Sequence, residues 1–169
     1  MLVIAVVGRK KSGKTTIVEG VTGTLSKLGC KVAVLKHIHH DNFDVDVPGK
    51  DTWRASRAGA VAVVGTSHAK TFLELRKSLD LRSLLEAIEI LVHPDVVLLE
   101  GFSGEIGLVD GAYVISLGGR DFRGNLLCEC SGPGDLERAV KSVEEMLRRA
   151  DVSRACQQHR NEPTGIQDD

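Results

Sequence analysis

Apolar residues follow two patterns that alternate along the chain. Short, mainly apolar runs predict strands; the runs 2–7 and 60–64 are expected to be fully buried, and the run 96–99 to lie at the centre of the sheet. These runs occupy residues 2–7, 31–36, 60–64, 96–99 and 113–117. Apolar residues that recur every three or four positions predict helices over 17–28, 81–91 and 136–147. The alternation predicts an α/β fold with a mostly parallel sheet and helices on both faces.

Weaker patterns occupy the segments between these elements. Asp51 is expected to cap a short helix that runs through Arg57. Residues 68–75 are expected to form an added or edge strand, and residues 126–129 a further short strand. The polar connection 37–51 is long, which is typical of functional or mobile loops. Residues 151–169 are polar and lack periodicity, so we expect one domain over residues 1–150 and a largely disordered tail over 151–169.

The first predicted strand leads into a glycine-rich loop that precedes the first predicted helix. Residues 8–16 match the phosphate-loop pattern G-x-x-x-x-G-K-[ST] at every fixed position, which predicts a P-loop NTPase-type fold. Glycines let backbone N–H groups converge on one anion, and the helix N-terminus adds its positive dipole end. Lys14 is expected to reach the β- and γ-phosphates, Thr15 to bind Mg²⁺ and Thr16 to add a hydroxyl contact. The expected nucleotide-binding residues are Gly8, Arg9, Lys10, Lys11, Ser12, Gly13, Lys14, Thr15 and Thr16.

A second polar segment leaves the carboxyl end of the strand predicted at 31–36. It reads Lys36-His37-Ile38-His39-His40-Asp41. Ligands bind at the carboxyl ends of parallel strands, so we expect this segment to face the same crevice as the phosphate loop. His39 is a candidate for nucleotide contact and Asp41 for a catalytic role. A transition-metal site and an ordinary solvated loop are the alternatives.

Two carboxylates follow other predicted strands. Glu100 ends the run 96–99, where nucleotide hydrolases often place an acid that holds Mg²⁺ directly or through water. Activation of the attacking water by Glu100 is an equal alternative, and an ordinary strand-end carboxylate is a third. Asp121 follows the strand 113–117 and is a candidate acceptor of hydrogen bonds from a guanine base. An exposed loop aspartate is the other interpretation of Asp121.

Composition and charge narrow the range of partners. The net charge is −1, so no overall field attracts nucleic acid or an acidic membrane surface. The basic cluster Arg9-Lys10-Lys11 lies within the phosphate loop, which accounts for it without a polymeric ligand. No apolar run reaches the roughly 18 residues that a membrane helix requires. The N-terminus lacks the pattern of a secretory signal, so we expect a cytoplasmic protein.

Four cysteines complete the candidate chemistry. They are Cys30, Cys128, Cys130 and Cys156. Cys128 and Cys130 would share one face of a strand, and we interpret them as buried free thiols because their spacing matches no common zinc pattern. Metal binding by this couple is the less favoured alternative. A reduced cytosolic setting fits this cysteine usage best.

The order of these motifs resembles the MobB family of molybdopterin-guanine dinucleotide biosynthesis accessory proteins. The resemblance covers residues 1–102 and rests on segments 8–16, 36–41, 48–54, 58–60 and 99–102. It implies a GTP-binding protein with Mg²⁺, usually a homodimer, that assists the guanylyltransferase and hydrolyses GTP slowly at most. It also implies that Gly13, Lys14 and Thr15 hold phosphates and Mg²⁺, with Glu100 near the metal.

The same resemblance implies that Asp41 and Lys50 belong to a mobile loop of the crevice. The sequence departs from the family pattern at two places. Ser103 stands where members commonly have a lysine after Glu-Gly-Phe, and residues 104–108 replace the Pro-Lys-Ile stretch that usually follows it. Contact between this chain and molybdopterin is an open possibility.

Two other functions are compatible with a phosphate loop. An ATP-dependent small-molecule kinase or ligase-type enzyme would use His39 or Asp41 as a base towards an acceptor hydroxyl. A non-hydrolysing binding module would use the nucleotide only to select a conformation that binds a partner.

Overall fold

The computed structural model describes residues 1–40, 43–118, 122–150 and 156. These residues form two compact units. The first unit comprises residues 1–37, 81–118, 122–150 and 156, and the second comprises residues 38–40 and 43–80. Of the predicted tail, only Cys156 is described, so the tail and the single-domain boundary stay predictions.

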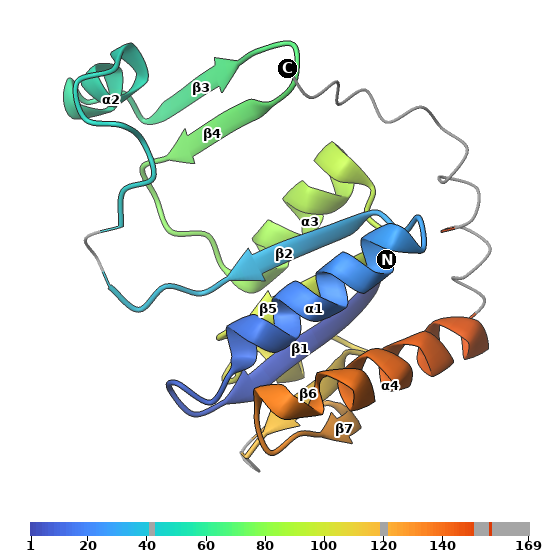
Figure 1. Cartoon of the computed structure of the whole chain (residues 1–169). Helices are drawn as coiled ribbons and strands as arrows, with labels where there is room; N and C mark the ends of the chain where they lie inside the picture. The colour runs from blue at the N-terminus through green and yellow to red at the C-terminus, as the bar shows by residue number, and fades with distance from the viewer. Residues whose placement is uncertain (41–42, 119–121, 151–155, 157–169) are drawn as a thin grey trace. The chain divides into compact units, whose positions relative to one another are not determined.

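The first unit is built on a five-stranded parallel sheet with the strand order β2-β5-β1-β6-β7. The strands are β1 (Leu2–Gly8), β2 (Val32–Lys36), β5 (Val96–Glu100), β6 (Tyr113–Leu117) and β7 (Asn125–Glu129). The helices are α1 (Lys14–Lys27), α3 (Leu81–Val92) and α4 (Leu136–Arg149), with 3₁₀ turns at Ile106–Leu108 and Pro133–Asp135. Figure 1 shows α1 and α4 in front of the sheet.

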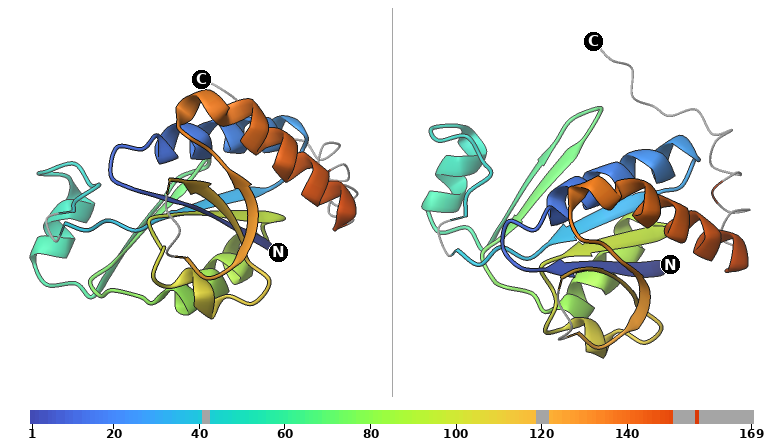
Figure 2. Two further views of the ribbon diagram at one scale, coloured as in Figure 1. Left: turned by 90° about the horizontal axis from the view of Figure 1, so that it is seen from below. Right: turned by 60° about the horizontal axis from the view of Figure 1, so that its bottom comes forward.

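Helices cover both faces of this sheet, as the apolar pattern predicts. Ile4 and Val6 of β1 pack with α1 and α4, whereas Val3, Ala5 and Val7 pack with α3. The views in Figure 2 keep α1 and α4 together on one side of the sheet and α3 on the other. Side chains on a strand point alternately to the two faces, so a strand covered on both must be apolar throughout. This is why β1 and β5 are continuous apolar runs.

The second unit contains one short helix and a two-stranded antiparallel sheet. The helix is α2 (Asp51–Arg57), and the strands are β3 (Ala62–Thr66) and β4 (Thr71–Leu75). Two predictions are wrong here. The run 60–64 is not a buried strand, because Val61 is 83% and Val64 60% exposed. Lys50, rather than Asp51, is the N-cap of α2, and Asp51 lies in its first turn.

The cysteines divide into two pairs. Cys128 and Cys130 are buried free thiols with their Sγ atoms 4.0 Å apart, which confirms that prediction. Cys30 and Cys156 form a disulfide that the sequence reasoning did not foresee, since it expected a reduced setting. Within the described ranges, no helix combines the length and apolar character that crossing a membrane requires.

Candidate phosphate-binding site

The loop from Gly8 to Gly13 joins the end of β1 to the start of α1, and both glycines are required by its path. A Cβ atom on Gly8 would lie 2.6 Å from the carbonyl oxygen of Leu117 on the neighbouring strand. Gly13 has a φ of 94°, and a Cβ atom there would lie 2.7 Å from Cδ of Pro133. Lys11 also has a positive φ of 63°. The loop is therefore a tight turn that leaves no room for a Cβ atom at Gly8 or Gly13.

Hydrogen-bond donors gather along this turn. The Lys14 ammonium donates to the carbonyl oxygens of Gly8 at 3.0 Å and Arg9 at 2.7 Å. The Ser12 hydroxyl is buried and has no hydrogen-bond partner among the described residues. α1 starts at Lys14 without a side-chain cap and without an acidic residue in its first turn, so the helix itself supplies no group that compensates its N-terminal N–H groups and dipole. This arrangement favours an anion.

Glu100, at the carboxyl end of β5, connects the loop to the middle of the sheet. The Thr15 hydroxyl donates to Glu100 Oε1 at 2.9 Å, and Lys36 Nζ lies 3.3 Å from the same oxygen. Glu100 is only 8% exposed. A hydroxyl and a buried carboxylate beside a phosphate-binding turn are oxygen ligands of the kind that Mg²⁺ prefers. The residues present therefore fit both a phosphate group and Mg²⁺.

The segment that follows Glu100 is held against the end of β2. The backbone N–H of His37 donates to the Glu100 carbonyl oxygen at 2.8 Å. Gly101 has a φ of 91°, and a Cβ atom on it would lie 3.1 Å from the His37 carbonyl oxygen. The rings of His37 and Phe102 lie 5.4 Å apart. These contacts fix the backbone from which the Glu100 side chain projects.

A pocket of about 780 Å³ adjoins the phosphate loop on the side of β6 and β7. It opens at the carboxyl ends of β1, β6 and β7, the edge of a parallel sheet where ligands bind. Its lining includes Gly8, Arg9, Ser103, Ser116, Gly118, Phe122, Glu129, Cys130, Ser131 and Arg138. Burial raises the pKa of the Cys130 thiol to about 12, and the neighbouring Cys128 adds to the rise. Cys130 is therefore a neutral wall of this pocket at physiological pH.

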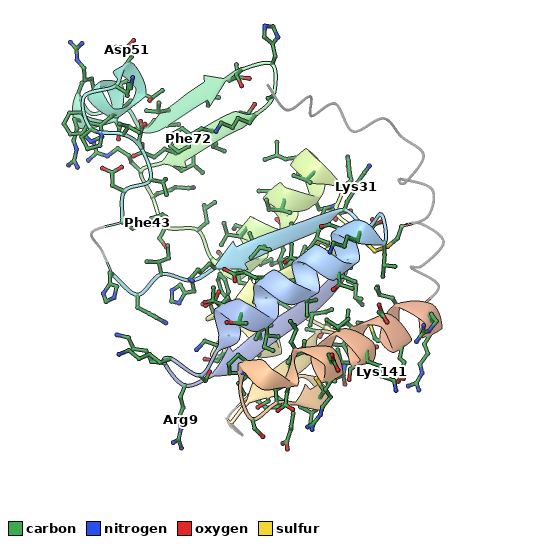
Figure 3. The ribbon with its side chains drawn as sticks, in the orientation of Figure 1. Arg9, Lys31, Phe43, Asp51, Phe72 and Lys141 are labelled. Carbon is green, nitrogen blue, oxygen red and sulfur yellow. A yellow bond between two sulfur atoms is a disulfide. The ribbon has the colours of Figure 1, made fainter. Side chains whose placement is uncertain are left out.

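The structure brings some of the predicted site residues together. Arg9, Lys10 and Lys11 are exposed on the loop, and Figure 3 shows the Arg9 side chain extending away from it. His39 is exposed and belongs to the second unit. Asp41 and Asp121 lie outside the described residues. The metal candidates Thr15 and Glu100 are in direct contact.

Sequence reasoning missed two charged residues of the site. Lys36 pairs with Glu100, and Glu129 lines the pocket. Both residues end a strand of the parallel sheet, as Glu100 does. A charged residue at the end of a strand is therefore the sequence signal by which they could have been found.

Comparison with known proteins identifies the family. Residues 3–107 match the family model of MobB, Molybdopterin guanine dinucleotide synthesis protein B. The chain belongs to the MobB family. A relative from Methanocaldococcus jannaschii is 35% identical over 121 residues, which are 72% of this chain and 49% of that protein. The molybdopterin-guanine dinucleotide biosynthesis adapter protein of Haemophilus influenzae is 35% identical over 104 residues, 60% of this chain and 57% of that protein.

The chain thus spans about half the length of the curated relatives it matches. A crystal structure of molybdopterin-guanine biosynthesis protein B (mobB) has a TM-score of 0.61 and 26% identity, covering 87% of this chain and 99% of that chain. Bacillus subtilis MobB, with a TM-score of 0.59 and 23% identity over 84% of this chain and 98% of its own, shares the fold. The predicted P-loop NTPase-type α/β fold and the resemblance to MobB are confirmed.

Proposed function

We propose that the protein binds GTP with Mg²⁺ at residues 8–16 and acts as an accessory protein in the biosynthesis of molybdopterin guanine dinucleotide. The observation that carries the nucleotide part is the 2.9 Å hydrogen bond from Thr15 to Glu100. It joins the first turn after the phosphate loop to a buried acid 85 residues away. Membership of the MobB family supports the pathway.

Each polar group of the loop has a role in this proposal. The Lys14 ammonium and the N–H groups at the start of α1 would bind the phosphates, and the Ser12 hydroxyl would gain the partner it lacks within the described part of the chain. Thr15 and Glu100 would hold Mg²⁺, which when bound neutralises phosphate charge. Arg9, Lys10, Lys11 and Thr16 would add to the positive field and the hydroxyl contacts around the anion.

The pocket beside the loop is the place that we propose for the base. Its volume of about 780 Å³ leaves room for a nucleoside next to Gly8. The Glu129 carboxylate on its wall has two acceptor oxygens. Guanine offers two adjacent donors, at N1 and the exocyclic amine, whereas adenine has an acceptor at N1. Glu129 joins Asp121, which stays a candidate from the sequence, as a reader of guanine.

The partner in this proposal is the guanylyltransferase that attaches GMP to molybdopterin. The names of the Haemophilus influenzae and Escherichia coli relatives, which call them adapter proteins of this biosynthesis, support it. We further propose a cytoplasmic homodimer in which hydrolysis of GTP is slow, with Glu100 and Asp41 as the candidate catalytic residues and His39 as a nucleotide contact.

Thermal unfolding with different nucleotides tests the proposal. We expect GTP with Mg²⁺ at a hundredfold excess over its Kd to add about 2.7 kcal/mol of stability to the wild type. ATP should add much less, because its base cannot donate two hydrogen bonds to a carboxylate. Lys14→Ala should lose the GTP effect. Lys141→Ala makes the same chemical change on an exposed position of α4 and should retain it.

Two results would contradict the proposal. Greater stabilisation by ATP than by GTP would exclude the guanine assignment. An unchanged GTP effect in Lys14→Ala would exclude the phosphate loop as the binding site. For the accessory role, adding the GTP-loaded protein to the guanylyltransferase should increase formation of the dinucleotide cofactor, and rapid GTP hydrolysis by the protein alone would argue against that role.

A further inference from the structure

One oxygen atom of Glu100 is shared by two different partners. Oε1 accepts the Thr15 hydroxyl at 2.9 Å and lies 3.3 Å from Lys36 Nζ. Lys36 is paired in register with Glu100, since each ends its own strand of the sheet. The β2–β5 ladder therefore places the ammonium at the carboxylate, independently of the phosphate loop.

The two members of this ion pair differ greatly in exposure. The Glu100 side chain is 10% exposed, whereas that of Lys36 is 51% exposed. A buried carboxylate needs a compensating positive charge, because burial removes the water that would solvate it. Lys36 supplies that charge from a flexible, half-solvated side chain that can leave without unpacking the core.

A divalent cation held by Thr15 and Glu100 would bring a second positive charge to the carboxylate that Lys36 neutralises. Two cations at one carboxylate repel each other, so the cation and the Lys36 ammonium would compete for Glu100. An ammonium released from Glu100 stays at the carboxyl edge of the sheet, where the phosphates are expected. Phosphate oxygens are then the strongest available acceptors for it.

We propose that Lys36 is the resident counter-ion of Glu100 and that cation binding transfers its ammonium to the terminal phosphate of the nucleotide. The inference rests on the proposed function, because it needs a nucleotide and Mg²⁺ at the loop. Lys36 would thereby bind the third phosphate of the nucleotide when the cation site is occupied. It would favour a triphosphate over a diphosphate only when the cation is in place.

The first measurement is Mn²⁺ affinity without nucleotide, followed by electron paramagnetic resonance. Lys36→Met keeps an unbranched side chain that is one atom shorter and removes its charge. We expect this variant to bind Mn²⁺ roughly threefold to fivefold more tightly than the wild type, a modest change because solvent screens the half-exposed lysine. Lys141→Met, the same substitution on an exposed position of α4, should leave the affinity unchanged.

The second measurement is the preference for GTP over GDP by calorimetry with Mg²⁺. We expect Lys36→Met to lose roughly tenfold of this preference, since one charge-assisted hydrogen bond to the terminal phosphate is removed. Lys36→Arg keeps the charge and should retain both the wild-type Mn²⁺ affinity and most of the preference. A merely structural role of Lys36 would change melting temperature and not this ratio.

The outcomes separate this inference from the proposed function. A wild type that binds neither GTP nor Mn²⁺ would overturn both. A wild type that binds both, with a Lys36→Met variant of unchanged or weaker Mn²⁺ affinity, would overturn the inference alone. An unchanged preference for GTP over GDP in Lys36→Met would also overturn the inference alone. Loss of this preference in Lys36→Arg would overturn it as well.

Discussion

At Gly13, the backbone conformation of the phosphate loop determines whether the loop can bind an anion. Its φ is 94°, and a Cβ atom there would lie 2.7 Å from Cδ of Pro133. Alanine would have to adopt a left-handed backbone and displace Pro133 as well. We expect Gly13→Ala to lower the free energy of unfolding by about 1–3 kcal/mol and to weaken binding of inorganic tripolyphosphate. Urea unfolding and calorimetry measure the two effects.

Gly111 provides the control for this substitution. Its φ is 73°, and nothing lies within 4 Å of a Cβ atom placed on it. Gly111→Ala therefore has the unfavourable backbone without the collision and lies outside the loop. It should lose less stability than Gly13→Ala and bind tripolyphosphate like the wild type. Unchanged anion affinity in Gly13→Ala would contradict the role given to the turn.

The site was predictable from the sequence where its residues are close together along the chain. Residues 8–16 match a local sequence pattern that identifies a phosphate loop. The contact of Thr15 with Glu100 is expected when that pattern is combined with an acid at the end of a strand. The pairing of Lys36 with Glu100 was not predictable in this way. It depends on β2 lying beside β5, and strand order results from packing over the whole sheet.

Within α1, substitutions at two glycines distinguish the effect of packing on stability from that of helix propensity. A methyl group on Gly20 would overlap the Cδ atoms of Leu136 at the start of α4, whereas a methyl group on Gly23 would meet nothing within 4 Å. Gly23→Ala should raise the free energy of unfolding by about 0.5–1 kcal/mol, because alanine loses less backbone entropy in a helix. Gly20→Ala should instead lower it by about 1 kcal/mol, because overpacking exceeds that gain.

Denaturant unfolding of the two variants measures the difference. Gly23→Ala is the matched control, since it makes the same substitution one turn along the same helix. Equal stabilisation by both substitutions would show that the Leu136 side chain moves aside for the methyl group. In that case its contact with Gly20 would not constrain the packing of α1 against α4.

The elements themselves were predicted well where both faces of a strand are covered and poorly where they are not. The run 60–64 has the same apolar continuity as β1 and β5, yet Val61 and Val64 are exposed. β3 pairs only with β4 and has no second strand beside it among the described residues. A continuous apolar run shows that a segment is hydrophobic but not that helices cover both of its faces. The sequence therefore could not distinguish the exposed strand β3 from the buried strands β1 and β5.

On the scale of the whole molecule, the disulfide between Cys30 and Cys156 closes a loop over 126 residues of sequence separation. A cross-link over so long a loop restricts the unfolded chain, which typically adds about 2–4 kcal/mol to stability. We expect reductant to lower the wild-type free energy of unfolding by about that amount and to leave Cys156→Ser unchanged. Titration of denatured, unreduced protein with a thiol reagent should detect only the free pair, Cys128 and Cys130. Detection of all four thiols without reductant would contradict this pairing.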